Sequence, residues 1–450
     1  MTRPAVPRRR RSPAQIFALG FLSILLVGAV LLCLPISSRS GAPTPFLDAL
    51  FTATSATCVT GLVVRDTFTY WSPFGQAVIL TMIQIGGLGF VTIGLLVSMA
   101  SGRKIGFRQR HLMQQSADLP QIGGVLRATR RILCITAACE LLGAALLAFV
   151  FVPQFGVGKG LWFGLFHSIS AFCNAGFDLM GEAAPFSSMT GFAGHGLVNL
   201  VLMALIIIGG IGFSVWEDVY RHGLHFRHYR LQSKLVLTTT AVLLVVPFLL
   251  FYFGELSRPA WQDLSAAERF WGAAMHTVSP RTAGFNTLDY GNFSEVGILL
   301  TVLLMLVGGA PGSTAGGLKV TTAATMYLSI RSILRRKNDV EAYGRRLADD
   351  ALARACVLIA LYIGLVVFGA SVMCVLDGAP LLDSLFEAAS AVATVGLSRG
   401  LTPTLCPVSR VILIFLMYLG RIGGLTLLYA VAAHRTDAVV RLPQEDVSLG

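Results

Sequence analysis

Eight stretches of this chain are long and apolar enough to cross a lipid bilayer as helices, which takes about 20 mostly apolar residues each. Of the 450 residues, 54% are hydrophobic and only 13% are charged, whereas soluble globular proteins carry about 25% charged residues. The stretches are residues 16–34, 74–100, 132–152, 196–216, 235–254, 296–330, 352–376 and 408–433. The sequence therefore predicts an all-α integral membrane protein with eight transmembrane helices.

The basic residues predict the orientation of these helices. Most of the 35 lysines and arginines lie in the two tails and in the connections after the second, fourth and sixth stretches, beginning with the run Arg8 to Arg11. Such residues resist translocation and mark the cytoplasmic side. We therefore expect both termini in the cytoplasm and a multi-pass location in the plasma (inner) membrane. Basic flanks of membrane helices also account for the net charge of +12, so no nucleic-acid partner is needed.

Two sequence marks recur four times in the same order, which indicates internal repeats. The first is a short amphipathic segment that ends in a glycine, and three copies carry a serine six residues before that glycine. The glycines lie 115, 108 and 112 residues apart: Gly61, Gly176, Gly284 and Gly396. The second mark is a glycine pair: Gly86-Gly87, Gly209-Gly210, Gly308-Gly309 and Gly423-Gly424. Glycine pairs alone would mean only close helix packing, which does not explain the serine-to-glycine segments.

Each copy reads as a span, a short segment of about 10–14 residues, a glycine turn and a second span. The short segment suits a re-entrant helix better than a crossing one. Non-helical backbone at membrane depth is tolerated where it faces protein or a water-filled cavity. We therefore expect four pore helices with pseudo-fourfold symmetry around one pore. The predicted boundaries are a basic tail (1–15), repeats at 16–110, 111–232, 233–348 and 349–434, and a second tail (435–450).

The turns of these repeats contain no ionisable group, which is typical of a site that binds a dehydrated cation through peptide oxygens. Glycine lets carbonyl groups turn toward a common axis, and each short helix would direct its negative C-terminal end there. The sequence predicts a filter for a monovalent cation, and we expect this cation to be K⁺. Its residues are Val59, Thr60, Gly61, Asn174, Ala175, Gly176, Thr282, Ala283, Gly284, Thr394, Val395 and Gly396.

The sixth stretch is interrupted by proline and clustered glycines, which break helices. We expect two half-helices joined by a loop just below the filter, and this loop is a candidate gate rather than a fixed kink. Its residues are Gly308, Gly309, Ala310, Pro311, Gly312, Ser313, Thr314, Ala315, Gly316 and Gly317, followed by Lys319. Arg421 lies inside the last stretch. A membrane-embedded arginine costs about 2.5–3.5 kcal/mol, so we expect loop carbonyls as partners and a positive barrier in the pathway.

Together, the four serine-to-glycine segments, the broken loop and Arg421 resemble the Trk/Ktr/HKT superfamily of potassium transporters, and most of all its Ktr-type membrane subunit. The resemblance extends from about residue 16 to about residue 433. It implies that Gly61, Gly176, Gly284 and Gly396 are filter glycines, that residues 308–317 form the gate and that Arg421 is the last-span arginine. Some plant members with sodium preference carry serine at the first glycine, so Gly61 favours potassium.

The resemblance also implies partners. These are a second copy of the chain, in a homodimer with one pathway per protomer, and a KtrA-like cytoplasmic ring of Rossmann/RCK-type subunits that bind ATP or ADP. Some Ktr systems are stimulated by Na⁺, although no sodium site is recognisable in this sequence. The chain has no GxxxxGK[ST] motif, and we expect no organic cofactor on it. The expected function is gated potassium uptake.

Two other functions are considered. The first is an ion-coupled symporter that moves K⁺ with Na⁺ or H⁺, for which Glu140 in the third stretch is the candidate coupling residue. The second is an intramembrane enzyme. No Ser/His/Asp, HExxH or paired-aspartate pattern supports it, so we expect no enzymatic activity.

Remaining residues with metal or redox chemistry have simpler interpretations. The eight cysteines show no CxxC spacing and fall mostly in apolar segments, where cysteine packs as a small apolar residue. His222, His225 and His228 are spaced as metal ligands can be, but they lie in a basic connection, which favours a solvated loop. His167 and His276 recur near the start of two short segments, where we expect local hydrogen bonds.

Overall fold

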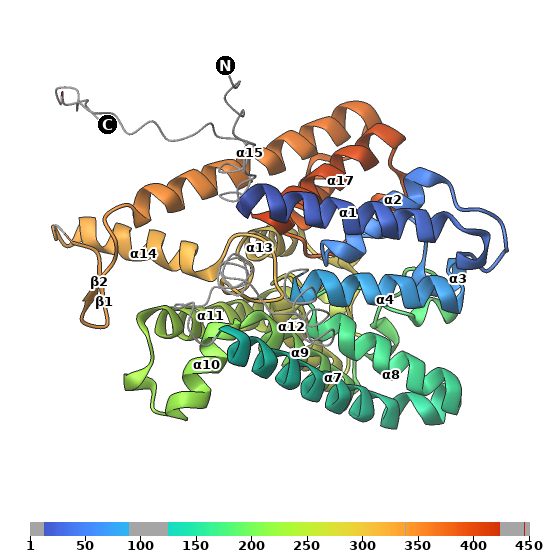
Figure 1. The fold of residues 1–450 in the computed structure, drawn as a ribbon, viewed down its shortest axis with the longest axis horizontal. Helices are drawn as coiled ribbons and strands as arrows, with labels where there is room; N and C mark the ends of the chain where they lie inside the picture. Colours follow the sequence, from blue (N-terminus) through green and yellow to red (C-terminus); the bar gives the residue numbers. More distant parts are fainter. Residues whose placement is uncertain (1–12, 90–124, 338, 424–444, 446–450) are drawn as a thin grey trace, which may run out of the picture.

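The computed structural model describes residues 13–89, 125–337, 339–423 and 445. These residues are mostly helical, and most of the helices run roughly along the long axis of the molecule (Figure 1). In four successive units a long helix is followed by a short helix and then by another apolar helix. This order agrees with the predicted succession of span, short segment and span.

The first unit begins with a long apolar helix and ends where a glycine stops the second one. Its elements are α1 (Pro13–Cys33), η1 (Pro35–Ser37), α2 (Phe46–Thr57), α3 (Thr67–Tyr70) and α4 (Pro73–Leu88). Helix α4 starts with Pro73 at its first position, where its missing N–H costs nothing. The Ser72 hydroxyl accepts the amide of Gly75 at 3.2 Å. The predicted continuation of this span to residue 100 lies outside the described residues.

The second unit differs from the prediction in its last helix. Its elements are α7 (Val125–Phe155), α8 (Val157–Phe172), η2 (Met180–Glu182), η3 (Thr190–Phe192), α9 (Gly196–Gly210) and α10 (Phe213–His222). The expected span over 196–216 is not one continuous helix, because α9 and α10 meet at 93°. Gly212 has φ +93° at the bend, a conformation that glycine adopts without strain. Helix α8, with 16 residues, is also longer than expected.

The third unit contains the interruption that the sequence predicts. Its elements are α11 (Leu231–Leu249), η5 (Leu250–Glu255), η6 (Pro259–Trp261), α12 (Ala266–Val278), η7 (Tyr290–Asn292), α13 (Glu295–Leu306) and α14 (Val320–Leu334). Between α13 and α14 the chain is irregular. Helix α12 starts with a capping box, in which Ser265 and Glu268 satisfy each other's backbone amides.

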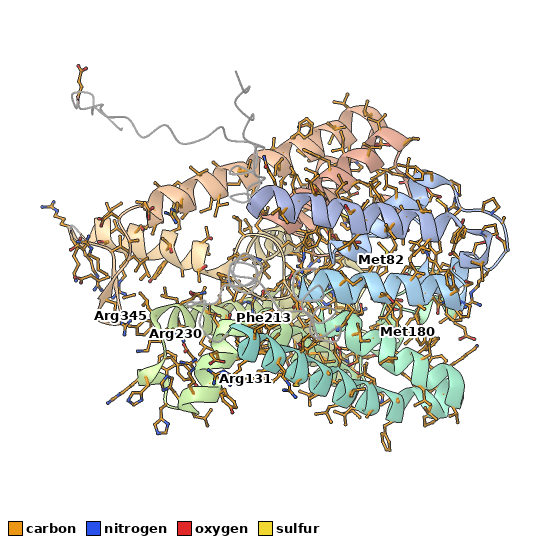
Figure 2. All side chains as sticks on the ribbon, in the orientation of Figure 1. Met82, Arg131, Met180, Phe213, Arg230 and Arg345 are labelled. Atoms are coloured by element: carbon orange, nitrogen blue, oxygen red, sulfur yellow. The ribbon has the colours of Figure 1, made fainter. Side chains whose placement is uncertain are left out.

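The fourth unit follows a small hairpin, β1 (Glu341–Ala342) and β2 (Arg345–Arg346). Its elements are α15 (Ala351–Asp377), α16 (Leu381–Val392), η8 (Thr402–Thr404) and α17 (Pro407–Ile422). Figure 2 shows Arg230 and Arg345 toward the end of the molecule that carries the hairpin, whereas Met180 lies toward the other end. One further short element, η4 (Phe226–His228), lies between α10 of the second unit and α11 of the third unit.

Three helical segments within the described residues are long and apolar enough to cross a membrane, and the bent pair α9–α10 makes a fourth. The three are Leu126–Phe155, Leu231–Glu255 and Ala351–Asp377. Three shorter apolar helices accompany them: Ala18–Cys33, Pro73–Leu88 and Glu295–Leu306. Residues 90–100 and 424–433, which belong to predicted spans, lie outside the described part. The chain is thus a multi-pass membrane protein, while the count of eight stays a prediction.

The C-terminal parts of the short helices are deeply buried. From Ala49 to Thr57 every residue of α2 except Leu50 is buried, and from Ser384 onward every residue of α16 but Leu385 is buried. Phe166 on α8 and Phe386 on α16 are completely inaccessible. By contrast, the long helices expose large apolar side chains such as Phe149. Their outward faces therefore suit a lipid environment, while the short helices hold the turns described next.

Candidate functional site

The four predicted turns share one backbone conformation. Each turn starts two residues after the end of a short helix, or four residues after it in the third unit. The first and third residues of each turn have positive φ while the second does not. The third residue is always glycine, with φ between +69° and +96°. The first residues are Val59, Asn174, Thr282 and Thr394, with φ between +53° and +69°. Left-handed backbone is costly for residues with a side chain. Its occurrence at the first residue of all four turns therefore indicates a conformation that the surrounding structure imposes.

The serine of each segment holds its turn, although not in the same way in every unit. The Ser55 hydroxyl accepts the amide of Gly61 at 3.0 Å, and Ser390 does the same for Gly396. In the second unit Ser170 instead donates to the carbonyl of Phe177 at 2.7 Å. In the third unit, where the spacing is one residue shorter, the Ser279 hydroxyl has no hydrogen-bond partner among the described residues, and the Ser279 carbonyl instead accepts the amide of Ala283 at 2.9 Å.

The four glycines lie against one another in a closed ring. A Cβ added to Gly61 would lie 2.5 Å from the Ala175 oxygen of the second turn. A Cβ on Gly176 would lie 2.8 Å from Cα of Gly284 in the third turn.

The ring closes through the third and fourth turns. A Cβ on Gly284 would lie 2.5 Å from the Val395 oxygen, and one on Gly396 would lie 2.1 Å from the Thr60 oxygen of the first turn. The structure thus brings all four predicted turns together, in chain order. No side chain fits at any of the four glycines without displacing the backbone of a neighbouring turn.

A second ring of glycines lies beside the first residue of each turn. Added Cβ atoms on Gly86, Gly209, Gly308 and Gly420 would lie 3.0–3.1 Å from side-chain atoms of Val59, Asn174, Thr282 and Thr394, respectively. The predicted fourth glycine pair, Gly423-Gly424, is therefore displaced by three residues, and Gly424 lies outside the described part. Arg421 follows Gly420 where the other units have a second glycine.

Residues 308–317 lie directly against the turns. A Cβ on Gly316 would collide with the Thr394 hydroxyl at 1.9 Å, and one on Gly317 would lie 3.1 Å from the Ala393 oxygen. The amide of Ala310 donates to Gly210 at 2.9 Å, which ties the loop to the α9–α10 bend. The loop therefore contacts the second, third and fourth units.

Arg421 completes these contacts by bridging the loop to the first unit. Its guanidinium donates to the Thr314 oxygen on the loop and to the Gly86 and Gly87 oxygens at the end of α4, the last at 3.2 Å. All its partners are peptide oxygens, so its charge is not neutralised by a carboxylate in these contacts. Lys319 donates to the Ala315 oxygen at 2.7 Å. Both cations thus face the same loop.

Two polar residues at equivalent positions of the short helices, His167 and Glu387, brace the segment after the turn, and the sequence did not indicate this role for Glu387. The His167 Nε2 accepts the amide of Leu179 at 3.1 Å. Glu387 is fully buried, and its Oε1 accepts the amide and the hydroxyl of Thr402, both at 2.9 Å. His276 stands at this position in the third unit. The signal was the shared position, one residue after Phe166, Met275 or Phe386.

Glu140 is a buried acid paired with an amide. Both its carboxylate oxygens accept from the Gln84 side chain, at 3.0 and 3.1 Å, and the Cys173 thiol lies 4.0 Å away. No basic side chain of the described residues forms an ion pair with it. Cys173 immediately precedes the second turn, so Glu140 lies behind that turn.

The remaining histidines and cysteines of the described residues form no metal site. The ring centroid of His228 lies 6.1 Å from those of His222 and His225, but no group of three histidine, cysteine or acidic residues within the described ranges could hold a metal. All eight cysteines are free thiols. The four turns and the 308–317 loop are therefore the candidate site.

Comparison of the sequence with known proteins shows the family to which the chain belongs. The sequence profile of TrkH, described as a cation transport protein, matches residues 21–442. The chain belongs to the TrkH family. Relatives similar over nearly the full length include the potassium/sodium uptake protein NtpJ of Enterococcus hirae, 40% identical over 98% of both chains.

Ktr system potassium uptake proteins B are also similar to this TrkH-family chain. The Bacillus subtilis protein is 40% identical over 98% of this chain and 97% of its own, and that of Vibrio alginolyticus is 35% identical over 99% and 98%. The crystal structure of the potassium transporter TrkH from Vibrio parahaemolyticus matches with a TM-score of 0.71 and 18% identity, over 96% of this chain and 87% of that one. That match shows the shared fold.

Proposed function

We propose that this chain mediates K⁺ uptake across the plasma membrane, through a pore that the four units enclose with pseudo-fourfold symmetry. The ring of Gly61, Gly176, Gly284 and Gly396 carries the proposal, because it brings four uncharged turns to one point. The similarity to potassium uptake proteins supports potassium as the transported ion.

The turns have the chemistry that a dehydrated cation needs. In this proposal the peptide oxygens of the turns face the pore axis, where they replace the hydration shell of the ion. The hydroxyls of Thr60 and Thr394 are buried and have no hydrogen-bond partner within the described residues, so they are free to add oxygen ligands. Each short helix ends next to its turn, and its C-terminal end, worth about half a negative charge, favours a cation.

The 308–317 loop is the proposed gate. It lies against three turns, and Arg421 joins it to the first unit. In this position the loop and the guanidinium charge would block a cation that leaves the ring. The gate opens when the loop moves away, and the small residues Gly312, Ser313 and Ala315 give it room to do so.

The partners follow from the resemblance to Ktr systems. The proposed assembly is a homodimer with one pathway per protomer, both termini in the cytoplasm, and a cytoplasmic ring of ATP- or ADP-binding subunits that controls the loop. Sodium acts at most as an activator in this proposal. The basic residues at the hairpin end, such as Arg345, agree with a cytoplasmic position for that end.

A flux assay tests the proposal. The purified full-length chain is reconstituted in liposomes, a voltage is imposed, and uptake of potassium, rubidium, sodium and lithium is compared. We expect K⁺ and Rb⁺ to enter and Na⁺ and Li⁺ to be largely excluded, without any second ion gradient. About 100 mV supplies roughly 2.3 kcal/mol per charge, which is enough to drive roughly fifty-fold accumulation. Equal entry of all four ions would contradict the filter assignment.

One observation favours a second candidate, an ion-coupled K⁺ symporter. Glu140 is a membrane-embedded acid directly behind the second turn, and its partner is the neutral side chain of Gln84. Such residues mark proton or ion relays in many transporters. In the same assay a symporter would move potassium only when a sodium or proton gradient is also present.

A further inference from the structure

Asn174 differs in residue type from the residues at the equivalent position of the other three turns. It is the first, left-handed residue of the second turn, where the others have Val59, Thr282 and Thr394. Among these four residues only Asn174 has an amide side chain, which both donates and accepts hydrogen bonds. It is 1% exposed. Its side chain therefore has to find partners within the protein.

Its partners lie on two other elements. The Asn174 Oδ1 accepts from the Thr314 hydroxyl of the loop at 3.3 Å, and Nδ2 donates to the Thr282 hydroxyl of the third turn at 3.5 Å. The Thr314 hydroxyl is also 3.1 Å from the Phe172 oxygen, at the end of α8. Thr314 and Thr282 are completely buried. The Asn174 amide thus contacts both the third turn and the loop.

Gly209 leaves room for the contact between Asn174 and Thr314, and its carbonyl holds the main chain of the loop in place. A Cβ on Gly209 would lie 2.9 Å from the Thr314 hydroxyl and 3.1 Å from the Asn174 oxygen. The backbone amide of Thr314 donates to the Gly209 oxygen at 3.3 Å. A side chain at Gly209 would therefore disrupt both groups. The main chain positions Thr314 so that its hydroxyl faces Asn174.

We infer that Asn174 and Thr314 form a latch that holds the loop closed against the second turn. The inference rests on the proposed pore and deepens it by assigning a positioning role to Asn174. When the loop leaves, the buried Asn174 oxygen loses its donor, which costs free energy. The same amide contacts the third turn through Thr282. Opening of the loop is thereby coupled to the geometry of two of the four turns.

The test compares rubidium uptake by wild-type and variant chains in liposomes under the same voltage. Thr314→Val removes the hydroxyl at nearly constant size and should raise the maximal rate roughly two- to tenfold, the worth of one hydrogen bond. The KM for K⁺ and the potassium-to-sodium preference should stay the same. Thr314→Ser keeps the hydroxyl and should restore a rate close to that of the wild type. Thr314→Ala serves as a second variant without the hydroxyl.

A double-mutant cycle with Asn174→Val completes the test. The first turn carries valine at the equivalent position, Val59, in the same left-handed conformation. The effects of Asn174→Val and Thr314→Val should be less than additive in the double variant, because the contact between these two residues is common to both changes, although Thr314 also contacts Phe172 and Asn174 also contacts Thr282. Fully additive effects would overturn the latch. So would a folded Thr314→Val protein that is no faster than the wild type.

Deletion of residues 312–315, which removes part of the proposed gate, separates this inference from the proposed function. If the deletion raises uptake and Thr314→Val does not, the gate stands and the latch is wrong. If neither change raises uptake, the gate itself is wrong and the latch falls with it.

Discussion

At the scale of single residues, the ring glycines are positions where no side chain fits. Gly61 has φ +96°, and a Cβ there would lie 2.5 Å from the Ala175 oxygen. Left-handed backbone costs a residue with a side chain about 1–2 kcal/mol. The collision adds a displacement of the carbonyl that we assign to the filter. We therefore expect residue identity at these positions to affect selectivity more than stability.

We expect Gly61→Ser to relax discrimination against sodium, because the shifted Ala175 oxygen no longer matches a potassium ion. Uptake of K⁺ and Na⁺ measured in parallel gives the ratio. Gly400→Ser is the matched control: Gly400 has φ +87°, but nothing lies within 4 Å of an added Cβ. Gly400→Ser should carry the energetic cost of a left-handed residue with a side chain but keep the preference for potassium over sodium. An unchanged ratio in Gly61→Ser would refute the filter assignment.

At the scale of elements, the interrupted helix matters most. The loop between helices α13 and α14 forms hydrogen bonds with the α9–α10 bend. One of them runs from the Phe213 amide to the Gly312 oxygen at 2.8 Å. The bend and the loop therefore support each other. Glycines at both sites permit backbone contact that side chains would prevent.

Deleting residues 312–315 should raise potassium uptake several-fold, because it removes the segment that lies under the turns together with the Thr314 partner of Arg421. Uptake in liposomes measures the rate, and thermal unfolding checks that the variant is folded. Retained preference for potassium over sodium would show that the filter is intact. Unchanged or lower uptake by a folded deletion variant would argue against the loop as gate.

At the scale of the whole molecule, the question is what drives the ion. The buried acid Glu140 is the one sequence candidate for coupling that we identified, and its bonds to Gln84 tie the second unit to the first. In a passive pore this contact only joins two helices. In a symporter it would carry a proton or hold a sodium ion.

We therefore expect Glu140→Gln to keep voltage-driven potassium uptake, since an amide is nearly the size of a carboxylate and retains hydrogen-bonding groups. The measurement is uptake with and without an imposed proton or sodium gradient. Loss of uptake in the variant, together with gradient dependence in the wild type, would favour the symporter.

The sequence by itself determined the membrane class, the four glycine turns and the interruption before Lys319, because apolar length, helix breakers and repeats are local or periodic signals. It did not reveal the bend between α9 and α10, since a 21-residue apolar stretch there reads as one span. It also placed the fourth glycine pair at Gly423 rather than at Gly420.

Only the tertiary structure decided which residues meet. The ring of turns, the contact between Asn174 and Thr314, and the bonds from Arg421 to Gly86 join residues that lie more than 100 positions apart. Local propensity and periodicity hold no information about such contacts, because these depend on how the four units pack together. Chemistry at each position can be read along the chain, but convergence on one point is a property of the packed molecule.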